Sequence, residues 1–368
     1  MNQPRNAPVE TPVEHAAAGA CPNRPLIDIR SLRERDLGIP GGAIHSSPEK
    51  LLELYGKSTP DEIAGGFIIC AEGIRSKALV LKLRTLGFEN FTSVAGGFQS
   101  WAATGLPVEY PAGLNAGQTD RYARHLVMPQ VGIEGQRRLL QSKILLAGLG
   151  GLNSPVALYL AAAGVGTLGL ADFDRVERSN LQRQVIHGES KVGELKASSA
   201  RDRIRELNPD TETVVYTQRI TPDNADAVLE PWDIVVDGTD SFSSRYALND
   251  ACVRASKPLV YGAVMRFQGQ VSVFWPAAPE SAAAPCFRCM IPQEPDAGEV
   301  PGCSQAGVLG VMPGIVGTLQ ANEAIKLALQ IGQPLLGKLL MIDALNMDFR
   351  KMNVAANPDC PACGLQAP

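Results

Sequence analysis

The sequence lacks a basic charge excess and any long apolar run. Its 368 residues carry a net charge of −4, which argues against a nucleic-acid binder because phosphate contacts need a basic field. The longest apolar candidate, Pro155 to Val165, is shorter than the roughly 20 residues that span a bilayer. The first 20 residues have no apolar central region, so they do not resemble a secretory signal. We therefore expect a cytoplasmic protein without nucleic-acid or membrane partners, and a disordered tail over residues 1–20.

Internal repeats are also absent, and the length suggests two domains. Short strand–helix units predict a small α/β domain over residues 21–110, followed by a linker over 111–117. From 118 to 368, strands alternate with helices, which predicts a Rossmann-like, doubly wound, mostly parallel sheet. Strands are expected at 25–29, 66–70, 91–94, 142–147, 167–171, 212–216, 234–237, 259–261 and 270–274.

A glycine-rich turn, Gly148-Leu-Gly150-Gly151, joins a strand to a helix in the second domain. Such a turn presents backbone N–H groups and a helix N-terminus to a phosphate. Asp172, at the end of the next strand, suits a carboxylate that binds ribose hydroxyls. Asn153 stands where the dinucleotide-binding motif has its third glycine, which disfavours a dehydrogenase.

Charged residues downstream favour phosphate chemistry over hydride transfer. Arg183 and Lys196 follow Asp172, and fixed cations stabilise the negative charge that spreads over the α-phosphate and the leaving pyrophosphate. Asp240 comes directly after a predicted strand, where a carboxylate is a natural Mg²⁺ ligand. These residues predict a site for ATP and Mg²⁺.

Five motifs occur in a fixed order in this second domain. They are Arg121-Tyr-Ala-Arg124, Gly148-Leu-Gly-Gly151, Asp172-Phe-Asp174, Ser179-Asn-Leu-Gln-Arg-Gln184 and Thr239-Asp240. Together they resemble the MoeB/ThiF adenylyltransferases, which are relatives of ubiquitin-activating enzymes, over about residues 117–364. Asn153 and Ser241 depart from that family, which usually has Gly and often has Asn at these positions.

The resemblance implies which residues form the site. Arg183, Lys196 and Asp240 would be catalytic, and Arg124 would reach the ATP of a neighbouring protomer, which implies a homodimer. The nucleotide-binding set implied in this way is Gly148, Gly150, Gly151, Asp172, Asp174, Ser179, Asn180, Arg183, Gln184, Lys196, Asp240 and Ser241.

Two Cys-x-x-Cys pairs lie far apart in the second domain, Cys286/Cys289 and Cys360/Cys363. Two such knuckles make a closed tetrahedral thiolate site, which is typical of structural Zn²⁺. The resemblance implies zinc as well, and four protein ligands leave no open position for catalysis. The alternative is four free thiols or a redox pair.

Cys303 lies in a polar segment bounded by glycines, Pro301 to Gly307. A nucleophilic thiol on such a segment can move into a site. The resemblance implies a catalytic cysteine here, since some family members use one in acyl or sulfur exchange. The alternative is an incidental thiol.

The loop Cys70-Ala-Glu-Gly-Ile-Arg-Ser76 joins an apolar strand to a helix in the first domain. Inward backbone N–H groups, the helix dipole and Arg75 favour a thiolate or persulfide at Cys70. With the segments 26–30 and 94–101, the loop resembles a rhodanese domain, which implies sulfur transfer by Cys70 and Arg75. Glu72 lowers the positive potential and disfavours small anionic donors such as thiosulfate. The alternative is an inactive interaction module.

Both resemblances together predict an adenylyltransferase with sulfurtransferase activity. It would adenylate the C-terminal glycine of a ubiquitin-like sulfur carrier, and a Cys70 persulfide, loaded by a donor such as a cysteine desulfurase, would then give the thiocarboxylate. This chain ends Leu-Gln-Ala-Pro, and we therefore expect the Gly-Gly carrier to be a separate protein. Molybdopterin, thiamin, tRNA-thiolation and specialised-metabolite pathways all fit. The alternatives are a thiosulfate sulfurtransferase with a non-catalytic nucleotide-binding domain, a NAD-dependent oxidoreductase and a persulfide-binding scaffold.

Overall fold

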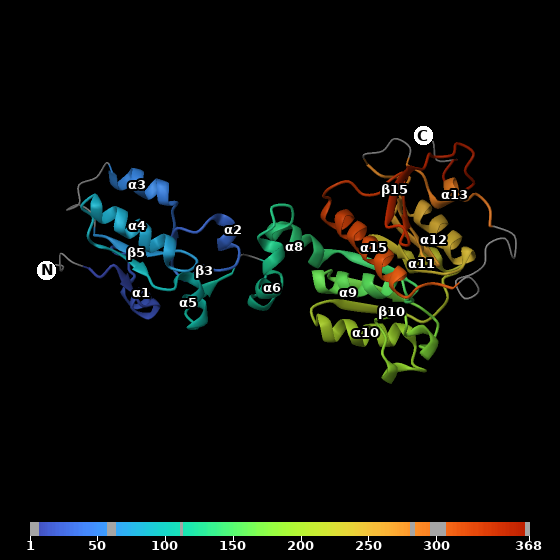
Figure 1. Ribbon diagram of the computed structural model, residues 1–368, viewed down its shortest axis with the longest axis horizontal. Coiled ribbons are helices and arrows are strands. Elements are labelled where there is room, and N and C mark those ends of the chain that lie inside the picture. The colour runs from blue at the N-terminus through green and yellow to red at the C-terminus, as the bar shows by residue number, and fades with distance from the viewer. Residues whose placement is uncertain (1–6, 57–63, 111–112, 280–283, 295–306, 365–368) are drawn as a thin grey trace. The chain divides into compact units, whose positions relative to one another are not determined.

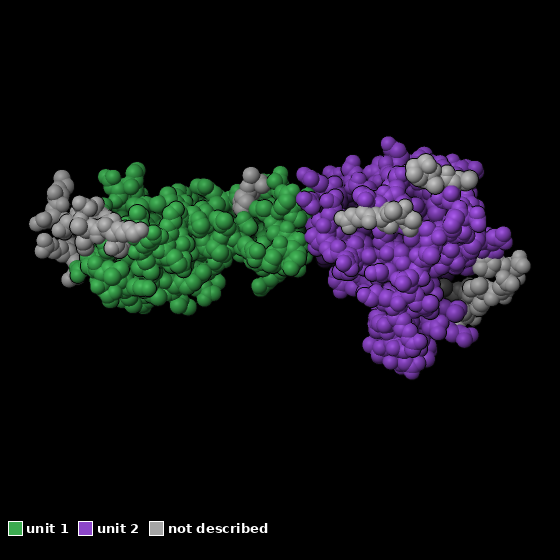
Figure 2. Space-filling model, turned by 90° about the horizontal axis from the view of Figure 1, so that it is seen from above, with its two compact units in different colours: residues 1–137 green, residues 138–368 purple. Residues whose placement is uncertain are grey.

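The computed structural model describes residues 7–56, 64–110, 113–279, 284–294 and 307–364. The chain divides into two compact units, residues 1–137 and 138–368 (Figure 2). Among the described helices, none has both the length and the apolar character needed to cross a membrane.

Unit 1 is built on a five-stranded parallel sheet with the order β1-β6-β5-β2-β4 (Figure 1). Strands β3 and β7 pair antiparallel and form a separate two-stranded sheet. The strands are β1 (Glu10–Thr11), β2 (Leu26–Asp28), β3 (Ile39–Pro40), β4 (Ile44–His45), β5 (Gly66–Ile69), β6 (Phe91–Val94) and β7 (Val108–Glu109). The helices are α1 (Val13–Gly19), α2 (Leu32–Arg35), α3 (Pro48–Gly56), α4 (Ile74–Thr85), α5 (Gly97–Ala103), α6 (Ala116–Arg121), α7 (Ala123–Leu126) and α8 (Gly132–Gln141), which runs past the boundary between the units.

Apolar side chains on both faces of this sheet are buried. Ile27 and Ile68 face a core with Leu79 and Leu83 of α4. The neighbouring positions Leu26, Phe67 and Ile69 face the opposite core, which contains α1 and Trp101 of α5. Because successive strand residues point to opposite faces, a sheet that is covered on both sides needs the continuous apolar run that β5 has. Cys70 follows β5 directly at its carboxyl end.

The N-terminal tail and the domain boundary differ from the expectation. The prediction of disorder over residues 1–20 is wrong for residues 10–19, which form β1 and α1. β1 pairs with β6, and Val13 and Ala16 are buried. Elements this short depend on tertiary packing rather than on their own propensity, so periodicity gave no signal. Helix α6 begins at Ala116, inside the expected linker, and the second unit begins at 138 rather than 118.

Unit 2 contains an eight-stranded sheet with the order β10-β9-β8-β11-β12-β13-β14-β15. The first five strands in this order are parallel, as expected, and the last three are antiparallel. The strands are β8 (Lys143–Ala147), β9 (Thr167–Ala171), β10 (Glu212–Tyr216), β11 (Ile234–Asp237), β12 (Leu259–Met265), β13 (Gln268–Phe274), β14 (Lys338–Asp343) and β15 (Asp348–Asn353). Strand order reverses between β8 and β11, and the carboxyl ends of strands at such a switch point form a ligand crevice.

Helices cover both faces of the unit 2 sheet. Helices α9, α10 and α15 pack together on one face of the sheet (Figure 1). Helices α11, α12 and α13 form a hydrophobic core with the opposite face of the sheet. Their bounds are α9 (Asn153–Ala163), α10 (Lys196–Leu207), α11 (Ala225–Leu229), α12 (Phe242–Arg254), α13 (Phe287–Met290) and α15 (Val311–Leu329). Two short 3₁₀ turns, η2 (Arg178–Asn180) and η3 (Glu189–Lys191), precede α10.

Candidate active sites

The glycine-rich turn after β8 lies against the turn after β11. Gly148 has φ +78°, and a Cβ there would lie 2.9 Å from the carbonyl oxygen of Gly238. Only glycine tolerates both this backbone conformation and this close approach. The two turns border a cavity of about 240 Å³ at the switch point. Its lining includes ten of the predicted nucleotide-binding and catalytic residues: Gly148, Gly150, Gly151, Asp172, Asp174, Arg183, Gln184, Lys196, Asp240 and Ser241.

Asn153, the departure from the glycine motif, ties these strands together. Its side-chain amide is buried and donates to the carbonyl oxygens of Ala147 at 3.0 Å and Gly148 at 2.7 Å. It also reaches the carbonyl oxygen of Val236 in β11 at 3.4 Å. A glycine could make none of these bonds. The substitution therefore fastens the ends of β8 and β11 to the start of α9.

Asp172 organises the cavity through its backbone contacts. Its carboxylate is 7% exposed and accepts the N–H of Leu149 at 2.7 Å and of Asp174 at 2.8 Å. Burial raises the pKa of Asp172, and the charge of Lys196 opposes that effect only in part. The Nζ of Lys196 lies 3.1 Å from the carboxylate of Asp174. This places a cation and two carboxyl groups along one wall of the cavity.

The residues of the fourth motif, Ser179 to Gln184, are divided between the cavity and its surroundings. Arg183 and Gln184 line the cavity, whereas Ser179 and Asn180 lie in η2 and are not among its lining residues. Arg183 donates to the Ser179 carbonyl at 3.2 Å, so that turn supports the arginine. Within the described part of the chain, the Oε1 of Gln184 is buried and has no hydrogen-bond partner. An orphaned acceptor beside a polar cavity fits a bound nucleotide.

Asp240 is exposed at the cavity, beside a buried charge cluster. Asp237 accepts the Thr239 N–H at 2.9 Å and the Thr239 hydroxyl at 2.6 Å, and Arg245 lies 3.6 Å from its other oxygen. Burial raises the pKa of Asp237 despite the charge of Arg245. Ser241 caps α12 by accepting the Ser244 N–H at 3.3 Å. The hydroxyl that replaces the family's amide thus starts the helix that follows Asp240.

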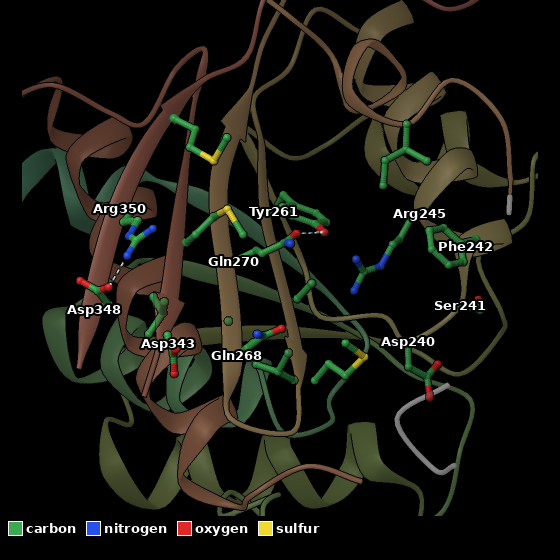
Figure 3. A pocket seen from close by; sticks show the side chains of 18 residues that line it. Asp240, Ser241, Phe242, Arg245, Tyr261, Gln268, Gln270, Asp343, Asp348 and Arg350 are labelled. Atoms are coloured by element: carbon green, nitrogen blue, oxygen red, sulfur yellow. Dashed lines mark hydrogen bonds and ion pairs between the residues drawn. The ribbon is translucent and has the colours of Figure 1, made fainter. Parts of the chain in front are cut away.

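A second pocket, of about 650 Å³, adjoins the first (Figure 3). Both are lined by Asp240, Ser241 and Arg245. Figure 3 shows Arg245 extending from α12 toward Tyr261, with the Asp348–Arg350 ion pair of β15 on the far side. Three methionines, Met265, Met341 and Met352, add apolar surface from β12, β14 and β15.

Three residues at or behind the cavity, Arg219, Arg245 and His187, were not predicted from the sequence. Arg219 lies 4.3 Å over the ring of Phe173, and both line the cavity. Arg245 donates to the carbonyls of Thr239 at 2.9 Å and Gly262 at 3.1 Å. His187 lies 3.0 Å from the carbonyl of Leu149, behind the glycine-rich turn. Phe173 lies in the Asp172-Phe-Asp174 motif. Arg219, Arg245 and His187 belong to no motif that can be recognised in a single sequence.

The four cysteines predicted to bind a metal come together. The sulfurs of Cys286, Cys289, Cys360 and Cys363 all lie within 4.8 Å of one another. The Sγ–Sγ distances are 3.5 Å for Cys286–Cys360, 3.4 Å for Cys289–Cys363 and 4.0 Å for Cys286–Cys289. Tetrahedral Zn–S bonds of about 2.3 Å imply S–S distances of about 3.8 Å. The cluster is consistent with zinc, and it fits a structural site because all four ligands come from the protein.

The Cys70 loop of unit 1 surrounds a buried sulfur with donors. Its Sγ accepts the N–H groups of Gly73 at 3.2 Å and Ser76 at 3.3 Å, and lies 3.3 Å from the Ser76 hydroxyl. Burial alone would raise the pKa of Cys70, but bonds from Ser76 and from backbone N–H groups outweigh it and lower the pKa. Gly73 has φ +87°, and a Cβ there would meet the Gly96 nitrogen at 2.8 Å. The loop therefore needs this glycine to favour a thiolate.

Arg75 has a carboxylate partner. Its guanidinium pairs with Glu34 of α2 through two hydrogen bonds. Glu34 carries no role in the sequence prediction, although Ser31-x-x-Glu34 is a capping-box pattern.

The catalytic and binding roles of the predicted site residues stay predictions, and two of these residues have not yet been placed. Cys303 lies outside the described residues. Arg124 lies in α7 of unit 1, and its contact with ATP of a neighbouring protomer stays a prediction.

The fold and the cavity define a nucleotide-binding α/β protein whose binding site lies at a topological switch point. Residues 122–362 match the ThiF family and residues 11–104 match the rhodanese-like domain. The chain belongs to the ThiF family, whose members use ATP. It is an adenylyltransferase that also carries a sulfurtransferase domain.

Similar proteins occur in several organisms. A sulfur carrier protein adenylyltransferase of Thermus thermophilus is 49% identical over 247 residues, covering 67% of this chain and 91% of the relative. The SAMP-activating enzyme E1 of Haloferax volcanii is 48% identical over 251 residues, covering 68% and 91%. The probable adenylyltransferase/sulfurtransferase MoeZ of Mycobacterium tuberculosis is 46% identical over 261 residues, covering 70% of this chain and 66% of the relative. The crystal structure of E. coli MccB with ATP shares the fold, with a TM-score of 0.56, 20% identity and coverage of 87% and 86%.

Proposed function

We propose that this chain adenylates the C-terminal glycine of a ubiquitin-like sulfur carrier with ATP and then converts it to a thiocarboxylate with sulfur from Cys70. The observation that carries the proposal is the junction of the two cavities of unit 2. They share Asp240, Ser241 and Arg245, so a peptide end in the larger pocket can meet a nucleotide in the smaller one.

The smaller cavity has the residues to hold the triphosphate. The Gly148–Gly151 backbone lies at the start of α9, where N–H groups favour anions. Lys196 and Arg183 add positive charge beside it. Asp240 is the residue that would hold Mg²⁺, which neutralises phosphate charge when bound. Asp172, at the end of β9, would accept ribose hydroxyls.

The larger pocket suits a flexible peptide tail. Its methionines are adaptable apolar contacts, and it opens over the antiparallel strands β12 to β15 (Figure 3). The carrier's terminal carboxylate would attack the α-phosphorus, the bond to pyrophosphate would break, and pyrophosphate would leave. Orientation and fixed charge are sufficient for this step, so it needs no general base.

Sulfur transfer follows from the Cys70 loop. The terminal sulfur of a Cys70 persulfide attacks the acyl-adenylate carbonyl carbon, and AMP leaves with the bonding electron pair. The product is an acyl disulfide on Cys70. A thiolate, which we assign to Cys303, then attacks the Cys70 sulfur, releases the thiocarboxylate and leaves a Cys70–Cys303 disulfide for an external thiol to reduce. The persulfide donor is a protein such as a cysteine desulfurase. We also infer a homodimer in which Arg124 of one protomer serves the ATP site of the other.

The test of the adenylation step uses the full chain and purified Gly-Gly carriers. Asp240→Ala should reduce carrier-dependent ATP–pyrophosphate exchange by about 100-fold, because it removes charge stabilisation at the phosphates. Asp223→Ala, an exposed acid outside both cavities, is the control and should retain exchange. Exchange that is unaffected by Asp240→Ala, or absent from the wild-type chain with every carrier, would contradict the proposal.

A further inference from the structure

The cation of the Cys70 loop is bound to a carboxylate from another element. Arg75 Nη1 lies 3.2 Å from one oxygen of Glu34, and Nη2 bonds the other. The Glu34 bond is the largest cause of the raised pKa of Arg75, and its interaction with Cys70 contributes less. The positive charge beside the sulfur is therefore largely compensated in unit 1 itself.

Glu34 is held in this position by its own helix. Its carboxylate accepts the Ser31 N–H at 2.9 Å and the Ser31 hydroxyl at 2.9 Å, and its N–H donates to that hydroxyl at 3.3 Å. Burial opposes ionisation, but Arg75 and Ser31 lower the pKa of Glu34 to about 2. The carboxylate is thus both fixed and negatively charged at neutral pH.

The remaining groups of the loop add no compensating cation. Glu72 contributes a second carboxylate, which lies 3.4 Å from the Gln99 amide. Lys77, in the first turn of α4, is paired with Glu10. The Cys70 thiolate is stabilised by Ser76 and by backbone N–H groups, which are neutral donors. Such donors suit one negative charge at the sulfur better than the three charges that a thiolate and a dianion bring together.

We propose that Glu34 is a specificity-determining residue that makes Cys70 select thiol persulfides over thiosulfate as its sulfur donor. This role rests on the proposed function of Cys70 as a sulfur carrier. With a persulfide R–S–S⁻, the Cys70 thiolate attacks the outer sulfur, the S–S bond breaks and R–S⁻ leaves. With thiosulfate, the same attack releases sulfite, SO₃²⁻. Both reactions give the Cys70 persulfide, but only the second brings a dianion to the paired Arg75.

Glu34→Gln tests this role without removing the helix cap. Glutamine is accepted at this position of a capping box, so the change removes the charge and keeps the bonds to Ser31. The wild-type and variant chains are incubated with thiosulfate or with hydroxyethyl persulfide prepared in situ, and Cys70 persulfide is measured by intact mass spectrometry. We expect kcat/KM for thiosulfate to rise about tenfold, equivalent to about 1.4 kcal/mol, with the persulfide rate changed less than about twofold.

Two further variants separate the role of Glu34 from general charge effects. Lys77 lies on α4, the same helix as Arg75, and Glu10→Gln removes its carboxylate partner. We expect this variant to keep the wild-type preference between sulfur donors. Adding Arg75→Gln to Glu34→Gln should abolish the gain with thiosulfate, because no cation is then released.

The possible outcomes distinguish this role from the function on which it rests. If both chains accept sulfur from the persulfide and the thiosulfate-to-persulfide ratio does not change, the role of Glu34 is wrong and the proposed function stands. If the wild-type chain accepts sulfur from neither donor, both are wrong. A gain of equal size in Glu10→Gln would also overturn the role.

Discussion

His187 supports the glycine-rich turn from behind. Its ring nitrogens lie 3.0 Å from the Leu149 carbonyl and 2.9 Å from the Ser199 hydroxyl, and its side chain is buried. Leu149 also donates its N–H to Asp172. One residue of the turn is therefore held on both sides, by a histidine and by the carboxylate predicted to bind ribose.

Acid should weaken unit 2 through His187. Burial lowers the pKa of His187 from its ordinary 6.5, the charge of Lys196 acts in the same direction, and the Leu149 bond opposes both. A proton therefore binds the unfolded chain more readily, so stability is present above pH 6.5 and is lost as pH falls below it. The loss per pH unit is at most about 1.4 kcal/mol for one proton.

Calorimetry checks this by following the thermal transition that ATP shifts, between pH 7 and 5.5. We expect the wild-type transition to fall more steeply with acid than that of His187→Asn. His45→Asn, a histidine of unit 1, is the control and should keep the wild-type slope. Equal slopes in wild type and His187→Asn would exclude the histidine as the source.

For single residues, the sequence predicts the site residues that belong to motifs and misses those that lie outside motifs. Asp172 follows β9 and Lys196 opens α10 at the same sheet edge, and Arg183 reaches the same cavity from the turn between η2 and η3. Glu34 and Arg75 are 41 residues apart, and no local pattern pairs them. Asn153 was recognised as a departure, but its use required the positions of Ala147 and Val236, which only the folded sheet provides.

The cysteine cluster fixes one element, α13, against the sheet. The N–H of Phe287, next to Cys286, donates to Asn249 of α12 at 2.8 Å, and its ring packs on Tyr246 and Tyr261 with centroid distances of 5.4 and 5.3 Å. Arg288 pairs with Asp250 at 2.7 Å. Helix α12 begins directly after Asp240 and Ser241, so the cluster supports the helix that borders both cavities.

Removing one ligand should therefore affect stability more than local chemistry. Cys360→Ser should lose bound zinc and lower the free energy of unfolding of unit 2 by about 4 kcal/mol, since loss of a metal site is among the most destabilising single changes. Metal content by mass spectrometry and denaturant unfolding measure the two effects.

The control for this change is Cys21→Ser, an exposed cysteine of unit 1. It should retain both zinc and stability. A wild-type chain without one equivalent of zinc, or a Cys360→Ser chain of unchanged stability, would exclude the structural role.

Elements were predictable where the hydrophobic pattern was strong. The expected strands 167–171, 212–216 and 234–237 match β9, β10 and β11. Strands β14 and β15 were not predicted. β15 is exposed along its whole length and shows no alternation of apolar residues, so it carries no strand pattern. The same antiparallel edge forms the wall of the larger pocket, so sequence alone could not predict that pocket.

The whole molecule combines two sites with separate chemistry. Unit 1 carries Cys70, whose pKa is lowered by hydrogen bonds from Ser76 and backbone N–H groups against the effect of burial, and unit 2 carries the nucleotide cavity and the adjoining pocket. Joining them in one chain raises the effective concentration of sulfur near the activated carrier. Each unit was recognisable from its own motifs, whereas the boundary at 137 was not, because α6 and α7 carry a ThiF motif yet belong to the compact unit 1.

The central claim is tested most directly by intact mass spectrometry of Gly-Gly carriers after incubation with the full chain, ATP and a persulfide donor. We predict that one carrier gains the mass that corresponds to replacement of one oxygen by sulfur, and that Cys70→Ser prevents this gain while Cys21→Ser does not. A full set of carriers that keep their original mass with the wild-type chain, or an undiminished gain with Cys70→Ser, would contradict it.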